Sequence, residues 1–550
     1  MDIVMVGLPG SGKSVVGKRL ANRHAATFID LDERIERTDG RPIPTIFAED
    51  GEAAFRRVER EAVEALGPAD PDPLVQRVIA TGGGAVVDPR NRWALYRHRV
   101  VVWLDGRPEV LAQRLRRSPH VRPLVQGRDP IGKLRELAAG RERFYAAADI
   151  HIAGVADVSS VVAAVEAHLA DRARGARTGT GLLSATTPIG RIVIGDGIAA
   201  RAIDAALGRL EARRALIVSE PGAWNAVGSR IAADIEAGGR AVEAVLLPEG
   251  EAAKRLSVVE TAASELARHH IARGEPLVAI GGGALGDAAG FLAATYLRGI
   301  PIVHVPTSLV AQIDSSIGGK TAVDLPEGKN LVGAFHQPTD IVIDVQLLAT
   351  LPERQRRAAL GEAVKMATLG DERLFELLER RGDAIARGDA SAMERGELAE
   401  VVERCAWAKI EVVLADERER AGGTGRIRLN LGHSLGHAVE AAAGFEALLH
   451  GEAVAYGLRA ACRIGEGLGV TPPERSARIG RVLDSLGLAV EPLPYTVEDV
   501  LRHLALDKKH EAGRLRWVLP TADGVEIRSD VPAEMVVDAA GSLLAAPSAR

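Results

Sequence analysis

Short apolar runs alternate with longer amphipathic segments along the first part of the chain. Strand-like runs lie at Asp2–Val6, Val78–Thr81 and Val100–Leu104, and segments such as Lys13–His24 between them carry apolar residues at helical spacing. This alternation is typical of an α/β domain with a parallel sheet. The pattern therefore predicts an α/β domain over residues 1–170.

Residues 171–186 interrupt this pattern. The stretch DRARGARTGTGLLSAT is rich in Arg, Gly and Thr and has no apolar periodicity, so we predict a linker there. Strand-like runs then return at Ala215–Ser219, Ala241–Leu247, Leu277–Gly281 and Ile302–Val305. They predict a second, Rossmann-like α/β domain over residues 187–346.

From about Leu347 the pattern changes again. Long Ala-, Glu- and Arg-rich segments with few β-branched residues predict a mostly helical domain over 347–550. A late hairpin is expected at Leu515–Pro520 and Gly524–Arg528. A site is expected in a cleft between the second α/β domain and this helical domain.

Composition narrows the class of protein. The chain has 550 residues, 47% of them hydrophobic and only 3% aromatic, and its net charge is −5. This balance fits a globular enzyme and argues against a generic binder of nucleic acid or of anionic membranes. Two cysteines exclude a disulfide framework, and the N-terminus lacks the basic region of a signal peptide. We therefore expect a cytoplasmic protein.

The segment Gly7-Leu8-Pro9-Gly10-Ser11-Gly12-Lys13-Ser14 fits a phosphate-binding loop, since it follows a predicted strand and opens a predicted helix. Lys13 would neutralise the β- and γ-phosphates of ATP, and Ser14 would hold Mg²⁺. Asp30 and Asp32 follow the next strand and are expected to alternate in direction. One carboxylate can then face Mg²⁺ through water and the other the acceptor hydroxyl.

Further polar positions follow in a definite order. Arg56 and Glu59 share a predicted helical face, Gly82-Gly83-Gly84 follows a strand, and Arg122 and Arg141 add cations. Together these positions resemble the shikimate kinase family over essentially all of residues 1–170. The resemblance implies these roles: ATP binding by Gly10, Ser11, Gly12, Lys13, Ser14, Arg117 and the lid residue Arg122; Mg²⁺ binding by Ser14 and, through water, Asp30; shikimate binding by Asp32, Arg56, Gly83 and Arg141.

Three loops at predicted strand ends converge in the second half. Gly281-Gly282-Gly283-x-x-Gly286-Asp287, Pro248-x-Gly250-Glu251-x-x-Lys254 and Thr307-Ser308 would together form a nucleotide site. Two glycine-rich segments follow and supply Lys320, Lys329 and Asn330 to a predicted anion pocket.

Glu362 and a group of histidines are candidate metal ligands. One Glu and two His can bind a divalent ion and leave positions open for substrate oxygens. His433 and His437 are four residues apart and would share a helical face, while His450 follows on a later loop. Spacing alone does not choose between His437 and His450.

The motifs PxGExxK, GGGxxGD, DSSIGGKTAV, GKNLVGAF, GEAVK, NLGHSxGHAxE and LHGEAVA stand in this order over residues 187–545. They resemble the 3-dehydroquinate synthase family. The resemblance implies these roles: zinc (or cobalt) binding by Glu362, His433 and His450; NAD binding by Glu251, Lys254, Gly281, Gly282, Gly283, Asp287, Thr307, Ser308, Lys320 and Lys329; substrate binding by Arg298, Asn330, Lys409, Arg426 and Lys508; catalysis by Asp314, Lys320, Lys365, His437 and Asn430. Ser219-Glu220 stands where the family has its ribose contact, so a ribose role for Glu220 is not implied.

The two resemblances imply a bifunctional enzyme of aromatic amino-acid biosynthesis, with Lys13 and Asp32 catalytic in its kinase. One domain would phosphorylate shikimate with ATP and Mg²⁺. The other would convert 3-deoxy-D-arabino-heptulosonate 7-phosphate to 3-dehydroquinate and phosphate with NAD⁺ and zinc, as a homodimer through this part. Two alternatives are a polyol dehydrogenase fused to another small-molecule kinase, and a scaffolding protein with a degenerate kinase. Accumulation of NADH, or absence of ATP turnover with shikimate, would favour them respectively.

Overall fold

The structure is a computed structural model that describes residues 1–70, 74–117, 129–154, 157–174, 179–417, 425–444, 447–505, 510–511 and 514–545. Its contacts divide the chain into two compact units. The first comprises residues 1–187, 191–202 and 342–346, and the second comprises the remainder. Among the described helices, none combines the length and the apolar character that crossing a membrane requires.

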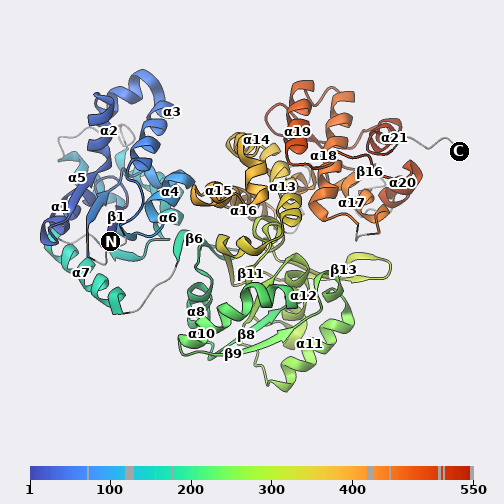
Figure 1. The fold of residues 1–550 in the computed structure, drawn as a ribbon, viewed down its shortest axis with the longest axis horizontal. Helices are drawn as coiled ribbons and strands as arrows, with labels where there is room; N and C mark the ends of the chain where they lie inside the picture. The colour runs from blue at the N-terminus through green and yellow to red at the C-terminus, as the bar shows by residue number, and fades with distance from the viewer. Residues whose placement is uncertain are drawn as a thin grey trace. The chain divides into compact units, whose positions relative to one another are not determined.

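The first unit contains a five-stranded parallel sheet (Figure 1). Its order is β2 (Thr27–Asp30), β3 (Arg77–Ala80), β1 (Asp2–Val6), β4 (Val100–Asp105) and β5 (Ile150–Ala153). Residues of α1 (Lys13–Arg23) and α7 (Val158–Arg174) share one buried core with these strands. The predicted α/β class and the three predicted strands are confirmed. Because all the strands are parallel, each connection between them needs a crossover, and helices supply it.

The remaining helices of this sheet domain connect its strands. They are α2 (Leu31–Asp39), α3 (Ile43–Glu64), α4 (Pro89–Tyr96), α5 (Pro108–Arg116) and α6 (Pro130–Tyr145). One sequence prediction about them is wrong. Strand β2 ends at Asp30, whose carboxylate accepts hydrogen bonds from the backbone N–H of Asp32 and Glu33 and so caps α2. Asp32 therefore lies in the first turn of a helix and does not alternate with Asp30 along a strand.

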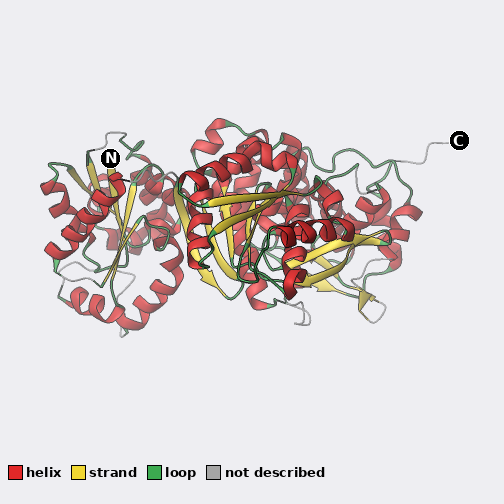
Figure 2. Ribbon diagram, turned by 90° about the horizontal axis from the view of Figure 1, so that it is seen from below, coloured by secondary structure: helices red, strands yellow, loops and turns green. Residues whose placement is uncertain are grey.

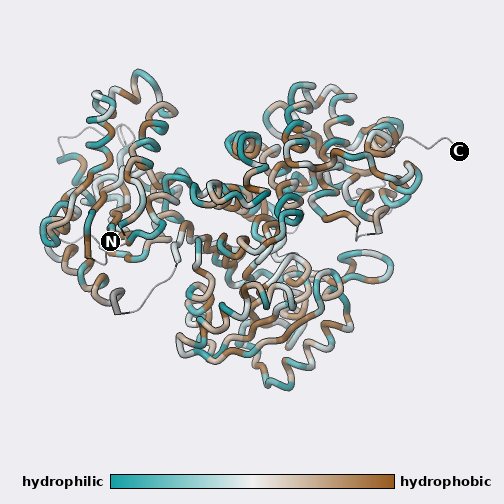
Figure 3. Tube along the Cα trace, in the orientation of Figure 1, coloured by the Kyte–Doolittle hydropathy of each residue, from teal (hydrophilic) through white to brown (hydrophobic). Residues whose placement is uncertain are grey.

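A second, seven-stranded sheet follows (Figure 2). Its order is β6 (Thr180–Thr187), β7 (Gly190–Asp196), β14 (Asp340–Asp344), β11 (Ile302–Pro306), β10 (Leu277–Gly281), β8 (Arg214–Ser219) and β9 (Ala241–Leu246). Pairing is parallel throughout the last five strands of this order, from β14 to β9. The strands of the sheet are largely hydrophobic in Figure 3, and β10, β11 and β14 are buried along their whole length.

Residues 171–186, predicted to form a linker, belong in part to regular elements. Helix α7 continues to Arg174, and residues 180–186 belong to strand β6, in which Leu182 and Leu183 are fully buried. The sequence pattern does not indicate this strand, because the Gly and Thr residues around the two leucines weaken its apolar alternation.

Helices α8 (Ala199–Arg209), α10 (Ser229–Ala237), α11 (Leu256–Arg268) and α12 (Gly283–Thr295) accompany the second sheet. Helix α12 packs against a hairpin of β12 (Lys320–Leu325) and β13 (Gly328–Phe335). Only glycine-rich segments with an anion pocket were predicted there. The sequence does not indicate the hairpin because glycine is rare in strand interiors, and here Gly333 lies close to the backbone of β12.

The last part of the chain is mostly helical, as predicted. Its long helices are α13 (Glu353–Thr368), α14 (Glu372–Arg387), α16 (Glu397–Ala415), α17 (His433–Ala442), α18 (His450–Gly467), α19 (Pro473–Ser485), α20 (Val497–Ala505) and α21 (Ala533–Gly541). The predicted late hairpin is present as β17 (Trp517–Pro520) and β18 (Val525–Arg528). Helix α18 contacts both α13 and α17, which brings Glu362 in the middle of α13 together with His433 and His450, the first residues of α17 and α18.

Candidate active sites

The phosphate-binding loop joins β1 to α1 in the first unit. Gly10 and Gly12 have φ angles of 82° and 93°, which glycine adopts without strain. The Nζ of Lys13 donates hydrogen bonds to the carbonyls of Gly7 and Leu8 at 2.9 and 3.0 Å. The hydroxyl of Ser14 donates to Asp30 at 2.5 Å. The structure thus places Ser14 and Asp30, the two residues predicted to bind Mg²⁺, side by side at the start of α1. The N-terminus of this helix also favours binding of an anion such as phosphate.

The Gly82–Gly84 turn gathers the residues predicted to bind the acceptor. A Cβ atom at Gly82 would lie 2.6 Å from Oδ1 of Asp32, and one at Gly84 would lie 2.9 Å from a guanidinium nitrogen of Arg56. Side chains larger than hydrogen would therefore push these two groups away from the turn. Residues that are far apart in the sequence consequently surround one short segment of bare backbone.

Helix α6 reaches the same turn from its other side. Arg141 donates a hydrogen bond to the carbonyl of Gly83 at 2.8 Å, and the Tyr145 hydroxyl donates to the same oxygen at 2.6 Å. Burial raises the pKa of Tyr145 to about 12, so its hydroxyl remains a donor at neutral pH. No role for Tyr145 was predicted from the sequence. Its four-residue spacing from Arg141 was the available signal, because that spacing puts both side chains on one helical face.

An ion pair holds Arg56 in place. Its guanidinium lies 2.7 Å from Glu59, which is buried, and 2.9 Å from Glu52. Burial raises the pKa of Glu59, and the attraction of Arg56 offsets only part of that rise. The arginine is therefore oriented by carboxylates of its own helix and can present its remaining N–H groups to an anionic acceptor.

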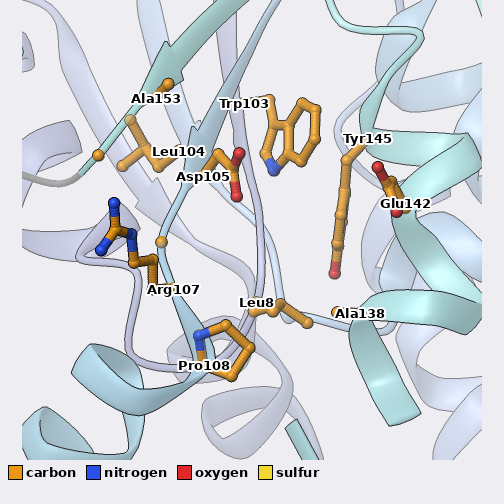
Figure 4. A pocket seen from close by; sticks show the side chains of 12 residues that line it. Leu8, Trp103, Leu104, Asp105, Arg107, Pro108, Ala138, Glu142, Tyr145 and Ala153 are labelled. Carbon is orange, nitrogen blue, oxygen red and sulfur yellow. The ribbon is translucent and has the colours of Figure 1, made fainter. Parts of the chain in front are cut away.

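A cavity of about 520 Å³ lies beside the phosphate-binding loop (Figure 4). Its wall includes Leu8 of the loop, Trp103 at the end of β4, and Ala138 and Tyr145 of α6. Arg117, predicted near adenine, is exposed just after α5 and is not part of this wall. Arg122 lies outside the described residues.

The nucleotide loops of the second unit are joined by Glu220, which follows β8. Its carboxylate accepts hydrogen bonds from the backbone N–H of Gly282 at 3.1 Å and of Gly250 at 2.9 Å. The hydroxyl of Ser308 would lie 3.7 Å from a Cβ at Gly282, and the N–H of Thr307 bonds to the carbonyl of Gly281. The three predicted loops therefore meet at the ends of adjacent strands, and Glu220 links two of them.

Charged residues extend from these loops along the β12–β13 hairpin. Buried Lys254 lies 2.8 Å from Asp287 and donates a hydrogen bond to the side chain of Asn330. Burial lowers the pKa of Lys254, but Asp287 and Glu251 outweigh this effect and leave it raised. Glu251 in turn lies 3.2 Å from Lys329. Four of the residues predicted to bind NAD thus form one connected cluster.

Glu362, His433 and His450 converge on one point. Oε1 of Glu362 lies 3.5 Å from Nε2 of His433 and 3.2 Å from Nε2 of His450. In a tetrahedral zinc site with bonds near 2.0–2.1 Å, ligand atoms lie about 3.3 Å from one another. Both oxygens of Glu362 are buried, with Oε1 facing the two histidines and Oε2 lying 2.5 Å from Nζ of Lys365. These distances and this donor set fit a divalent metal ion.

His437 also lies in this group. Helix α17 begins at His433 and carries His437 one turn later, as the spacing predicted. Ligand atoms of His433, His437 and His450 all lie within 4.8 Å of one another. Glu362 forms close contacts with His433 and His450, so the geometry favours these two as its co-ligands.

Two buried lysines adjoin the metal-ligand group. Lys365 lies 2.5 Å from Glu362, and Lys409 lies 2.8 Å from Asp314. Burial raises the pKa of Glu362, but Lys365 and the nearby histidines lower it well below its usual range. Burial likewise raises the pKa of Asp314, and Lys409 and Lys365 reverse that shift. Both acids are therefore carboxylates at neutral pH, facing cations in a buried setting.

Glu440 is a further residue at this site to which the sequence analysis gave no role. Its carboxylate lies 3.2 Å from Nδ1 of His450 and 3.3 Å from Lys329. Burial raises the pKa of Glu440, but the hydrogen bond from His450 outweighs it and sets a value of about 2. The available signal was the last position of NLGHSxGHAxE, where an acid stands seven residues after His433 and so on the same helical face.

The other predicted substrate residues are dispersed. Arg426 is buried and donates to the carbonyls of Gly318 and Glu417, and Asn430 lies at the end of the same short helix. Lys320 is exposed at the start of β12. Arg298 precedes β11, whereas the glycine turn follows the parallel strand β10, so the two lie at opposite ends of these strands. Lys508 lies outside the described residues.

Three family models match the chain in succession. They are shikimate kinase at residues 9–170, the N-terminal part of 3-dehydroquinate synthase at 244–358, and its C-terminal part at 359–510. The first match covers the phosphate-binding loop from Pro9 and the glycine turn. The other two cover the nucleotide loops after β9 and the complete metal-ligand group.

Solved structures resemble the same two regions. The 2-epi-5-epi-valiolone synthase of Streptomyces hygroscopicus, with NAD⁺ and Zn²⁺ bound, is 29% identical, with 64% of this chain and 96% of that one covered and a TM-score of 0.58. A 2-deoxy-scyllo-inosose synthase with carbaglucose-6-phosphate, NAD⁺ and Co²⁺ is 25% identical, with 67% and 100% covered and a TM-score of 0.59. The shikimate kinase of Acinetobacter baumannii is 33% identical, with 32% and 95% covered and a TM-score of 0.29.

The family matches and the residues that surround each site agree on the identity of both halves. The kinase match contains Lys13, Asp32, Arg56 and Arg141, and the synthase matches contain Glu362, His433 and His450. The chain therefore joins a member of the shikimate kinase family to a member of the 3-dehydroquinate synthase family.

Proposed function

We propose that this chain catalyses two reactions of aromatic amino-acid biosynthesis in the cytoplasm. Its kinase domain transfers the γ-phosphate of ATP to shikimate. Its synthase part converts 3-deoxy-D-arabino-heptulosonate 7-phosphate to 3-dehydroquinate and phosphate. One observation carries the proposal. The kinase match contains charged side chains around the bare backbone of a glycine turn, and the synthase matches contain charged side chains around a metal-ligand group.

In the kinase, positioning and charge neutralisation supply the rate enhancement. Lys13 and the loop N–H groups bind the transferring phosphate, and Ser14 and Asp30 hold Mg²⁺. Arg56 and Arg141 orient the planar carboxylate of shikimate, for which guanidinium groups are well shaped. Asp32 then accepts the proton of the attacking hydroxyl.

In the synthase, Glu362, His433 and His450 would hold a zinc ion, which polarises a substrate oxygen when bound. The three strand-end loops would hold NAD⁺, which supplies reversible hydride transfer when bound. Lys365 keeps Glu362 ionised, and Asp314 with Lys409 lies beside it to orient the reacting hydroxyl. Asn330 binds the substrate, and Lys329 belongs to the residues that would bind NAD⁺.

Two separate assays test this proposal. The purified protein should release phosphate from 3-deoxy-D-arabino-heptulosonate 7-phosphate with NAD⁺ and Zn²⁺, and it should form ADP from ATP only when shikimate is added. NADH should not accumulate, because the hydride is returned. Steady NADH formation with a polyol would instead identify a dehydrogenase, and absence of ADP formation with shikimate would identify a degenerate kinase.

The relatives make a different synthase product a specific alternative. A 2-epi-5-epi-valiolone synthase is similar over nearly all of its own length. We therefore include a seven-carbon sugar phosphate without a carboxylate in the assay. Turnover of that sugar in preference to the carboxylate-bearing substrate would contradict the assignment, in which Arg426, Lys365 and Lys409 meet the carboxylate and hydroxyls of the substrate.

We further propose that the protein forms a homodimer through its synthase part and acts on small molecules alone. Light scattering after size-exclusion chromatography measures the mass directly. A mass of one chain at micromolar concentration would contradict the dimer.

A further inference from the structure

The carboxylate of Glu440 lies between a proposed metal ligand and the nucleotide side of the site. Its Oε2 atom is 3.2 Å from Nδ1 of His450, and its Oε1 atom is 3.3 Å from Nζ of Lys329. Only 9% of the Glu440 side chain is exposed, so these two contacts replace most of its hydration. Lys329 also lies 3.2 Å from Glu251, which belongs to the loop after β9.

Hydrogen-bond chemistry then dictates the orientation of the His450 ring. An ionised carboxylate accepts hydrogen bonds and cannot donate, so Nδ1 of His450 carries a proton when it bonds to Glu440. The other nitrogen, Nε2, is thereby directed to the side where Oε1 of Glu362 lies 3.2 Å away. A neutral imidazole protonated at Nδ1 has its lone pair on Nε2, which is the form that binds a metal ion.

His433 shows the same arrangement with a different acceptor. Its Nδ1 atom lies 3.0 Å from the carbonyl of Leu431, and its Nε2 atom lies 3.5 Å from Glu362. Both rings thus bond through Nδ1 to a fixed acceptor and present Nε2 to the same carboxylate. An acceptor behind the metal-binding ring commonly fixes its orientation and its tautomer.

We propose that Glu440 is a positioning residue of the metal site, which holds His450 in its metal-binding orientation and is itself held by Lys329. This inference rests on the proposed function, because it takes Glu362, His433 and His450 as the ligands. It adds a role for a residue that contacts neither the ion nor the substrate. It also links the metal ligand to Glu251 of the nucleotide loop through one lysine.

A purely structural role makes a different prediction. Glu440 could serve only to join α17 to the hairpin through its ion pair with Lys329. Glu440→Gln would then be as harmful as Glu440→Ala, since both remove the negative charge. If Glu440 positions His450, the amide oxygen of Gln can still accept the Nδ1 proton, and Gln should restore most of what Ala loses.

Zinc binding by the full-length protein tests the inference without any substrate. The metal-free protein is titrated with Zn²⁺ alone in competition with a chromophoric chelator. Glu440→Ala should weaken zinc binding by about 10- to 100-fold, the usual effect of losing such an acceptor, and Glu440→Gln by clearly less. Replacing zinc by Co²⁺ should show an altered visible absorption spectrum in the Ala variant, because the coordination geometry changes when the ring is free to rotate.

Glu400→Gln is the matched control. Glu400 is also buried and ion-paired, at 2.8 Å from Arg373 and 3.0 Å from Arg404, and it belongs to α16, a helix that carries none of the three proposed ligands. Its zinc affinity should equal that of the unchanged protein. Circular dichroism establishes whether each variant is folded. If the Ala variant does not fold, the Gln variant is used alone, and the inference then predicts that its zinc affinity and its cobalt spectrum stay close to those of the unchanged protein.

Several results would overturn the inference. These are unchanged zinc affinity in folded Glu440→Ala, equal losses in the Ala and Gln variants, or an equal loss in Glu400→Gln. A folded Glu440→Gln variant whose zinc affinity falls by the full effect of about 10- to 100-fold would do the same. Failure of the proposed function looks different, because the unchanged protein would then bind neither zinc nor cobalt, and this inference would fall with it.

Discussion

The kinase and synthase sites of this chain are constructed in different ways. The phosphate-binding part of the kinase uses neighbouring residues of one loop, where Lys13 and Ser14 open α1. The metal-ligand group of the synthase takes Glu362, His433 and His450 from three helices, α13, α17 and α18. The first depends mainly on backbone conformation, and the second depends on tertiary packing and on a balance of buried charges. A substitution in the kinase loop should therefore affect mainly its own neighbours. A substitution in the synthase group should affect several packed and charged residues together.

The largest expected effect concerns the third metal ligand. His450→Ala should purify with little zinc and lose phosphate release, because Nε2 of His450 lies against Glu362. His437→Ala should keep its zinc and lose activity through poorer substrate positioning. Metal analysis of both variants after dialysis against a mild chelator measures this difference. Zinc lost from the His437 variant and retained by the His450 variant would reverse the assignment.

The next effect is confined to the kinase. Lys13→Met removes the cation that meets the transferring phosphate, so ADP formation with shikimate should fall at least about 100-fold. Phosphate release by the same preparation should be unchanged and serves as the control. Retained kinase activity would show that the loop of Gly7–Ser14 is not the ATP site.

A smaller effect is expected at the glycine turn. Tyr145→Phe removes the hydrogen bond to the carbonyl of Gly83 and should raise the KM for shikimate about fivefold, the scale of one hydrogen bond near 1 kcal/mol. Tyr96→Phe is the matched control, because the Tyr96 hydroxyl is buried and bonds to Phe144 instead. An equal change in both variants would show that the effect is one of general stability.

The smallest effect is expected from removing the kinase. A fragment that starts at Gly179 keeps strand β6 whole and should release phosphate at about the full rate. One that starts at Pro188 lacks β6 and should melt at a lower temperature, because Leu182 and Leu183 are buried in the intact chain. A folded Gly179 fragment without activity would contradict the independence of the two sites.

The sequence predicted the parts that depend on local pattern. Strands with continuous apolar runs, the phosphate-binding loop and the helical spacing of His433 and His437 all have a signal within a few residues. Their elements appear where they were expected.

The parts that were missed depend on distant partners. Strand β6 is concealed by Gly and Thr, and Asp32 belongs to a helix because Asp30 caps it. Glu440 and Tyr145 acquire their roles only when α18 and the glycine turn pack against them. No local pattern distinguishes such residues from ordinary buried polar groups.

One crossed measurement tests the account most directly. Lys13→Met and Glu362→Gln are each assayed for ADP formation with shikimate and for phosphate release from 3-deoxy-D-arabino-heptulosonate 7-phosphate. We predict that Lys13→Met loses only the first activity and that Glu362→Gln loses only the second, together with its zinc. Loss of both activities in either folded variant, or loss of neither, would contradict two separate sites on one chain.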